Sequence, residues 1–122
     1  MRALIVDDSK AIRKILNKTL GAIDIEVEEA IDGKDALDKL KVSHEHLDLV
    51  LVDWNMPEMN GLDFIKNVRG QEGFGNIPIM MVTTESEMEH MRLAMEAGAN
   101  EYLMKPFTKE MIEEKLAILG LR

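Results

Sequence analysis

The stretch LVLVDWNMPEMNGLDF, from Leu49 to Phe64, decides how the chain folds. Four apolar residues lead directly into one acid, Asp53, and a turn rich in Asn, Pro and Gly follows. A continuous apolar run of this length predicts a strand that is buried on both faces, as in parallel sheets. Asp53 therefore lies where the chain leaves the core and meets solvent, which is a position typical of a functional carboxylate.

Apolar runs alternate with helical patterns along the whole chain, which is typical of βα units that build a parallel sheet covered by helices. The sequence predicts five strands, at Leu4–Asp7, Ile25–Glu29, Asp48–Val52, Ile77–Val82 and Glu101–Met104. It predicts five helices, at Lys10–Leu20, Lys34–Val42, Leu62–Arg69, Glu87–Ala97 and Lys109–Leu119. Ser9 and Thr108 stand at the positions of N-cap residues, and Ser86 followed by Glu89 fits a capping box.

The order of the strands follows from their patterns. Ile25–Glu29 alternates apolar and acidic residues, and the fifth strand is also mixed, whereas the first, third and fourth strands are nearly continuously apolar. Alternation indicates an edge strand, and a continuous apolar run indicates an interior one. We therefore expect a doubly wound, flavodoxin-like α/β fold with the order 2-1-3-4-5. The length fits a single domain over residues 1–122, with no output domain.

Composition limits the functions that the chain can have. The net charge of -8 and the isoelectric point near 4.9 argue against a nucleic-acid-binding surface. The chain contains no cysteine, which excludes disulfides and thiolate chemistry. The first apolar run, Ala3–Val6, is too short for a signal peptide or a membrane span. We expect a cytoplasmic monomer that does not insert into a membrane.

Three acids are expected to meet at one point of this fold. Ligands of open parallel sheets bind beyond the carboxyl ends of the strands, where the strand order reverses, which here lies between the first and third strands. Asp7 and Asp8 end the first strand and Asp53 ends the third. Crowded carboxylates repel one another unless a cation is present, and oxygen ligands at an open surface suit Mg²⁺, with Mn²⁺ as an alternative. The pair Asp8 and Ser9 taken alone also fits a helix cap.

Thr83 and Lys105 follow the fourth and fifth strands at the same edge of the sheet. Taken singly, Thr83 fits a turn residue and Lys105 a solvated strand end. Together with the acids, they form the set that phosphoryl transfer requires: a carboxylate nucleophile, a metal and a cation that neutralise charge, and a hydroxyl donor. Lys105 precedes Pro106, which favours an extended backbone, so that the long side chain can reach across the strand ends.

These residues resemble the receiver domain of bacterial response regulators, and within that family the single-domain regulators of chemotaxis. The resemblance covers the whole chain and rests on five residues and three motifs: Asp7, Asp8, Asp53, Thr83 and Lys105, with LIVDDS at the first strand, VDWNMP at the third and KPF after the fifth. It implies a signalling switch of a two-component system that catalyses only its own phosphorylation and dephosphorylation. Its partners would be a histidine kinase, a downstream target such as the flagellar motor switch, and a phosphatase.

The resemblance also implies a role for each site residue. Asp53 would accept the phosphoryl group from the kinase, while Asp7, Asp8 and the backbone carbonyl of Asn55 would hold Mg²⁺ together with Asp53. The hydroxyl of Thr83 would contact the phosphoryl group. Lys105 would pair with one of the phosphoryl oxygens.

Two further roles concern the speed and the output of the switch. Asn55 and Glu85 match the positions that influence how fast the phosphoryl group is hydrolysed. Thr84 follows Thr83 at a position where receiver domains often have an alanine, which is smaller. Tyr102 matches an aromatic residue that turns inward when Thr83 moves toward phosphate; from the pattern alone, it fits a half-buried edge residue. The partner surface would comprise the fourth helix, fifth strand and fifth helix.

Two other classes of protein with related folds fit less well. Phosphohydrolases with an aspartyl nucleophile usually carry two acids separated by one residue on the first strand, whereas Asp7 and Asp8 are adjacent. A flavin-binding electron carrier needs a phosphate-binding loop of Ser, Thr and Gly after the first strand, which this sequence lacks. Within the switch class, a chemotaxis regulator and a stand-alone phosphorelay shuttle or phosphate sink both fit the sequence.

Overall fold

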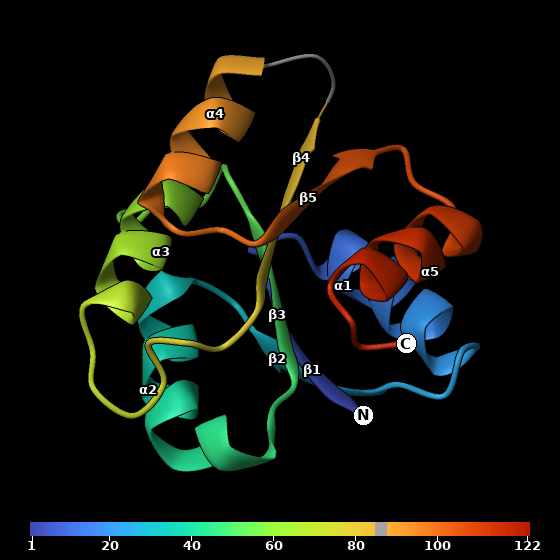
Figure 1. The fold of residues 1–122 in the computed structure, drawn as a ribbon, viewed down its shortest axis with the longest axis horizontal. Helices are drawn as coiled ribbons and strands as arrows, with labels where there is room; N and C mark the ends of the chain where they lie inside the picture. The colour runs from blue at the N-terminus through green and yellow to red at the C-terminus, as the bar shows by residue number, and fades with distance from the viewer. Residues whose placement is uncertain (85–87) are drawn as a thin grey trace.

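In the computed structural model, the described residues, 1–84 and 88–122, form five strands, five α-helices and one short 3-10 helix (Figure 1). The strands are β1 Arg2–Val6, β2 Glu26–Ala30, β3 Leu49–Asp53, β4 Ile79–Thr84 and β5 Glu101–Lys105. The helices are α1 Lys10–Gly21, α2 Gly33–Ser43, η1 His44–His46, α3 Gly61–Arg69, α4 Met88–Ala97 and α5 Lys109–Ile118. Within the described ranges, no helix combines the length and the apolar character that a membrane crossing needs.

All neighbouring strands pair in parallel, in the order β2-β1-β3-β4-β5. Helices α2, α3 and α4 cover one face of the sheet, and α1 and α5 cover the other, as Figure 1 shows. The predicted fold class and strand order are confirmed. The edge position of β2 explains its alternating sequence, because only the central strands are enclosed on both faces.

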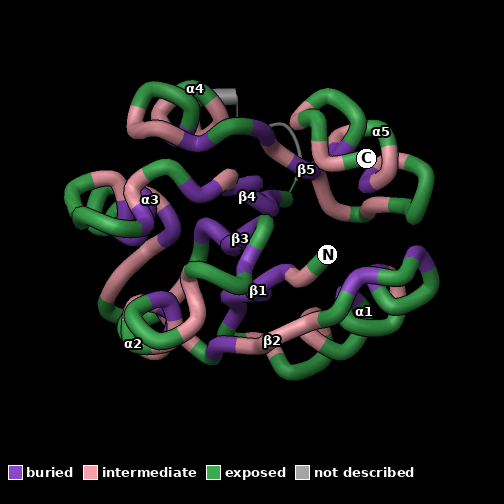
Figure 2. The backbone as a smooth tube through the Cα atoms, turned by 60° about the horizontal axis from the view of Figure 1, so that its bottom comes forward, coloured by how far each residue is buried: buried purple, intermediate pink, exposed green. Residues whose placement is uncertain are grey.

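The alternation of side chains along each strand divides the core into two clusters. Val50 and Val52 of β3 pack with α2, α3 and α4, whereas Leu49 and Leu51 pack with α1 and α5. Every residue of β3 is buried, and Figure 2 shows the buried residues running through the strands while the outer faces of the helices are exposed. Residues next to each other at a strand end thus face different groups of helices.

Helix starts are fixed by side-chain caps. The hydroxyl of Ser9 accepts a hydrogen bond from the Ile12 backbone, and that of Thr108 accepts one from the Met111 backbone, so both predicted caps are confirmed. Asp32 and Asn60 cap α2 and α3 in the same way. The predicted capping residue Ser86 lies outside the described residues.

Within the described residues, element ends differ from the prediction by at most two residues, and the predicted start of the fourth helix, Glu87, lies outside these residues. The difference at β4 has a clear cause. The sequence predicts a start at Ile77, but β4 begins at Ile79. Pro78 has no backbone N–H to donate, and Ile77 donates its own N–H to Phe74 in a turn instead. At its other end β4 extends to Thr84, so Thr83 lies inside the strand.

The segment after β3 returns close to the strand end. The backbone N–H of Gly61 donates to the carbonyl of Trp54 at 2.9 Å. A Cβ atom at residue 61 would lie only 2.5 Å from the carbonyl oxygen of Asp53. Glycine is therefore required here by the close approach of two backbone segments.

We predict that Gly61→Ala lowers the free energy of unfolding by about 1–3 kcal/mol, the usual cost of overpacking, because neither backbone segment can yield easily. Gly21→Ala is the matched control, since a Cβ at Gly21 would meet nothing within 4 Å. Urea denaturation measures both variants. Equal stability of the two variants would contradict the steric role of Gly61.

Candidate functional site

The register of the strands brings the predicted site residues to one edge of the sheet. Asp53 pairs with Val82, and Thr84 pairs with Lys105 on the next strand. Side-chain alternation places Asp53 on the same face as Leu51, which packs toward α1 and α5. Residues 53 and 105, although far apart in the sequence, therefore face the same space.

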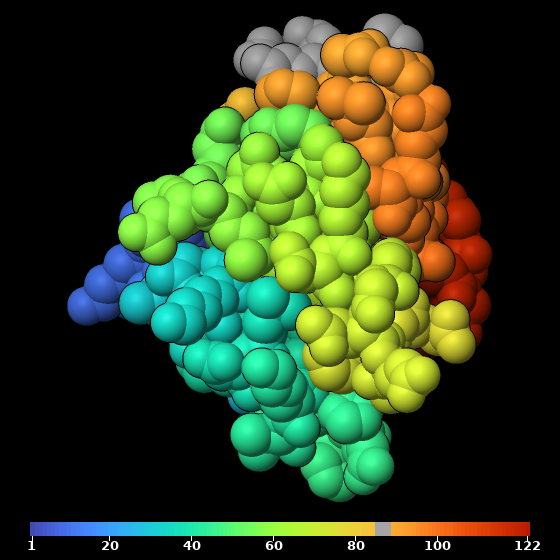
Figure 3. All heavy atoms as spheres, turned by 90° about the vertical axis from the view of Figure 1, so that its left-hand side faces the viewer, coloured from blue at the N-terminus to red at the C-terminus, as the bar shows by residue number. Residues whose placement is uncertain are grey.

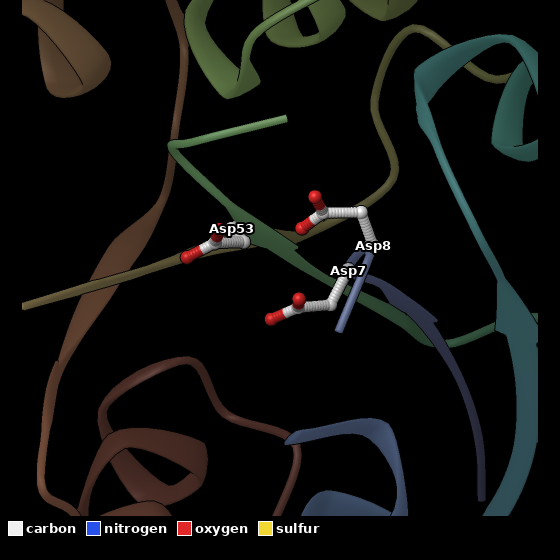
Figure 4. Close-up of side chains that lie close together, drawn as sticks. All are labelled: Asp7, Asp8 and Asp53. Carbon is white, nitrogen blue, oxygen red and sulfur yellow. The ribbon is translucent and has the colours of Figure 1, made fainter. Parts of the chain in front are cut away.

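Three carboxylates converge in that space. One ligand atom from each of Asp7, Asp8 and Asp53 can be chosen so that all lie within 4.8 Å of one another. Asp7 and Asp53 are buried and Asp8 is exposed. Figure 4 shows the three carboxyl groups reaching the same region from the end of β1 and the end of β3. The acidic crevice expected from the strand order is thus present.

Lys105 contributes the positive charge. Its ammonium group donates to Oδ1 of Asp53 at 3.0 Å and lies 3.6 Å from Oδ2 of Asp7. The lysine side chain is only 16% exposed, so water screens these contacts weakly. The Lys105–Pro106 peptide bond is cis. One cation therefore faces three acids, which leaves the crevice with net negative charge.

The protonation of Asp53 reflects this imbalance. Burial raises the pKa of the Asp53 carboxyl above its ordinary value, and the charges of Asp7 and Asp8 act in the same direction. The hydrogen bond and the charge of Lys105 oppose this rise in the pKa without cancelling it. A further cation would lower this pKa, so Asp53 favours binding of a positive ion.

The donor set fits a hard divalent cation. Oδ1 of Asp7 accepts a hydrogen bond from the Ser9 backbone at 2.8 Å. Oδ2 of Asp7 is buried, and within the described residues it has no hydrogen-bond donor. Its charge is paired with Lys105 at 3.6 Å, beyond hydrogen-bond distance, so the oxygen can still accept a closer partner. All the available ligands are oxygens, as Mg²⁺ prefers. The residues present therefore suit Mg²⁺ better than a metal that favours nitrogen or sulfur.

Arg13 of α1 forms hydrogen bonds that hold the end of β1 next to the acids. The sequence patterns did not identify this residue. Its guanidinium donates to the backbone carbonyl of Asp7 at 2.7 Å and to the carboxylate of Glu29 at 3.0 Å. These bonds tie the end of β1 to β2 and α1. A basic residue one turn into the helix after the acidic pair was the only sequence signal for this contact.

Thr83 and Tyr102 lie on adjoining strands. Thr83 is 2% exposed, and Tyr102 is half-buried against the core cluster under α2, α3 and α4. Tyr102 pairs with Met81, two residues before Thr83 on the same face of β4. The two side chains are therefore neighbours on one face of the sheet.

Lys115 of α5 holds Tyr102 from outside. Its ammonium group lies 4.1 Å from the centroid of the Tyr102 ring and donates to the buried carboxylate of Glu101 at 3.1 Å. The same carboxylate oxygen accepts from the Tyr102 backbone. A cation over an aromatic face in this geometry is attractive. Lys115 and Glu101 were not predicted as site residues, because a lysine on a helix usually indicates only a solvated face.

Two of the remaining predicted residues, Asn55 and Thr84, are exposed. Asn55 is exposed in the segment after β3, where it lines a shallow hollow together with Asp8. Thr84 is exposed at the end of β4. Glu85 falls outside the described residues. Asn55 thus borders the acidic crevice beside Asp8, and Thr84 lines a separate hollow together with Lys105.

Comparison with known proteins agrees with this architecture. A family model described as "Response regulator receiver domain" matches residues 3–117. The chain belongs to the response regulator receiver domain family. Receiver domains bind Mg²⁺ through acidic residues, and this one presents such a group at its strand ends.

Similar receiver domains include named chemotaxis proteins. The chain is 43% identical over 120 residues to chemotaxis protein CheY1 of Helicobacter pylori, covering 98% of this chain and 96% of that protein. It is 40% identical over 125 residues to the chemotaxis protein CheY homolog of Campylobacter jejuni, covering 98% and 93%. The structure of Vibrio cholerae CheY4 matches with a TM-score of 0.87 at 38% identity, covering 97% of each chain. The protein is therefore a CheY-like receiver domain.

We predict that Asp8→Asn weakens Mg²⁺ binding by about tenfold or more, because metal affinity depends on the number of charged ligands. Stability without metal should be equal or higher, since one repulsive charge is removed and the pKa of Asp53 falls. Calorimetric titration and urea denaturation measure the two effects. Asp38→Asn, an exposed acid on α2, is the control. Unchanged Mg²⁺ affinity with a large loss of stability would instead identify Asp8 as a structural residue of the helix start.

Proposed function

We propose that this receiver domain is a phosphorylation-activated signalling switch in which Asp53 accepts a phosphoryl group, in a Mg²⁺-dependent reaction, from a phosphohistidine of a histidine kinase. The observation that supports this proposal best is the contact of Lys105 with a buried Asp53 beside two further acids. A carboxylate in this setting is largely shielded from water, and a phosphodonor can still reach it from the open end of the crevice. The chain would catalyse only its own phosphorylation and dephosphorylation.

The transfer forms one bond and breaks one. A carboxylate oxygen of Asp53 attacks phosphorus while the bond between phosphorus and the histidine nitrogen breaks, and the neutral imidazole leaves with a proton from solvent. Asp7, Asp8, Asp53 and the carbonyl of Asn55 would hold Mg²⁺, which supplies positive charge to the oxygens of the transferring group. Hydrolysis of the aspartyl-phosphate by water reverses the switch, and Asn55 and Glu85 would influence its rate.

Lys105 and Thr83 would stabilise the phosphorylated state. The ammonium group of Lys105, now 3.0 Å from Asp53, can exchange this contact for a phosphoryl oxygen. Thr83 would donate its hydroxyl to another phosphoryl oxygen. Movement of Thr83 changes the space beside Tyr102, which lies on the same face of the adjoining strand.

The output would be a shift in population between two conformations of the surface formed by α4, β5 and α5. In the structure, Tyr102 is held by Lys115 and Glu101, both of which belong to this surface. When Tyr102 turns inward, the cation over its ring loses that contact. Phosphorylation can therefore change the charge and shape that a partner protein meets.

The similar proteins support chemotaxis as the pathway, because the matches from three organisms carry chemotaxis names. We propose a histidine kinase as phosphodonor and the flagellar motor switch as target, with a phosphatase as a further partner. A phosphorelay shuttle or phosphate sink is the alternative, and it would not need the output surface. The distance over which the wild-type and deletion strains spread through soft agar distinguishes these two pathways.

We predict that acetyl phosphate with Mg²⁺ adds one phosphate to the protein, detected by intact mass spectrometry, and that chelation of Mg²⁺ prevents this addition. Asp53→Asn should abolish the adduct, and the control Asp38→Asn should retain it. Because acetyl phosphate is a small donor, the test does not depend on the kinase. An undiminished adduct in Asp53→Asn would overturn the assignment of the phosphoacceptor.

We predict that beryllofluoride, a mimic of the phosphoryl group, shifts the amide NMR signals of β4, of Tyr102 and of α5. Thr83→Ala should reduce the distant shifts and leave those near Asp53 in place, because Thr83 carries the change to Tyr102. Thr84→Ala, at the neighbouring exposed position, is the control. If the distant shifts persist in Thr83→Ala, the coupling does not pass through Thr83.

A further inference from the structure

The only tryptophan in the sequence, Trp54, stands between two residues of the proposed site, Asp53 and Asn55. Its indole ring stacks on the imidazole ring of His90 in α4, with centroids 3.9 Å apart and ring planes 7° apart. Trp54 is buried and His90 is half-buried, so water has little access to the indole side of the stack. Figure 3 shows the green segment after β3 adjoining the orange first turns of α4 on this side of the molecule.

Asp53 and Trp54 serve opposite sides of the sheet. The Asp53 carboxylate contacts Lys105 in the crevice, whereas Trp54 belongs to the core cluster beneath α2, α3 and α4. Consecutive residues at a strand end point to opposite faces. A displacement of the backbone at these two residues therefore acts on the acidic crevice and on α4 together.

Two contacts hold the segment that carries Asn55. The carbonyl of Trp54 accepts from the backbone of Gly61 at 2.9 Å, which closes the segment on itself. The stack on His90 fixes the ring of Trp54 against α4. The carbonyl of Asn55, one residue further along, is the proposed backbone ligand of Mg²⁺. The position of this carbonyl thus depends on both contacts.

We propose that His90 is a positioning residue, which holds Trp54 and hence the Asn55 carbonyl where Mg²⁺ is bound, and which links the metal site directly to α4. This inference rests on the proposed function, because it assumes a cation among the three acids. The link differs from the one through Thr83, since it begins at the metal and needs no phosphoryl group.

The direction of the effect follows from the structure. The three carboxylates already lie close enough to share one ion, so the stacked arrangement is the one that accepts the metal. Removing the stack lets the segment leave this arrangement and lowers Mg²⁺ affinity. By reciprocity, Mg²⁺ binding must favour the stacked position of α4.

The test compares His90→Ala, which removes the ring, with His90→Phe, which keeps a ring that can stack. Calorimetric titration with Mg²⁺ alone should show about twofold to tenfold weaker binding for His90→Ala, the factor that corresponds to the loss of one aromatic pair. His90→Phe should restore parental affinity. Met95→Ala, an exposed position on the same helix, should bind as the parent does. Urea denaturation checks that all variants are folded.

Two spectroscopic measurements separate positioning from general stability. Access of acrylamide to the Trp54 fluorescence should rise in His90→Ala and stay at the parental value in His90→Phe. Addition of Mg²⁺ should shift the amide NMR signals of α4 in the parent, and this shift should shrink in His90→Ala.

If His90→Ala binds Mg²⁺ as tightly as the parent, or if His90→Phe does not bind it as tightly, the stack has no positioning role. If the phosphate adduct on Asp53 still forms in that case, the proposed function stands without this inference. Absence of both Mg²⁺ binding and the adduct in the parent protein would overturn the proposed function, and this inference with it.

Discussion

The contact between Lys105 and Asp53 is the interaction on which the site depends. Three acids share one crevice, and two of them are buried, so their ionised forms repel one another in surroundings of low polarity. Lys105 supplies the compensating charge without a metal, at 3.0 Å from Asp53. Breaking such a pair would leave buried charge uncompensated, which is costly. Lys105 therefore offsets part of the repulsion among the acids, and the crevice keeps a net negative charge that favours binding of a cation.

The position of Lys105 explains why the parallel sheet is needed. Lys105 lies on β5 and Asp53 on β3, with β4 between them. Two strand spacings amount to about 10 Å, and the Lys105 and Asp53 side chains bridge this gap together by meeting at 3.0 Å above β4. Both residues face the side of α1 and α5, because the register aligns positions of equal orientation. Any shift of one residue in this register would turn Lys105 to the other face.

The two faces of the sheet divide the work of the molecule. Alternation along the strands places Asp53 and Lys105 on the face under α1 and α5, whereas Tyr102 and Trp54 pack on the face under α2, α3 and α4, where alternation also places Thr83. Strand ends join these faces, since neighbouring residues point in opposite directions. Residues that face opposite sides are only one or two positions apart along a strand. A change of charge on one face can therefore alter the packing on the other. The surface of α4, β5 and α5 is well placed to respond.

The sequence by itself determined the strands, their order and the place of the acids, because these depend on local patterns. The continuous apolar run into Asp53 predicts a buried strand that ends in a carboxylate, and the alternation in β2 identifies an edge. The start of β4 was predicted two residues too early, since Pro78 was counted within an apolar run. The tertiary structure alone decided which distant side chains meet. The stack of Trp54 on His90 and the placement of Lys115 over Tyr102 join residues of different elements. Such contacts depend on how helices pack on the sheet and on side-chain rotamers, and neither quantity leaves a periodic signal in the sequence.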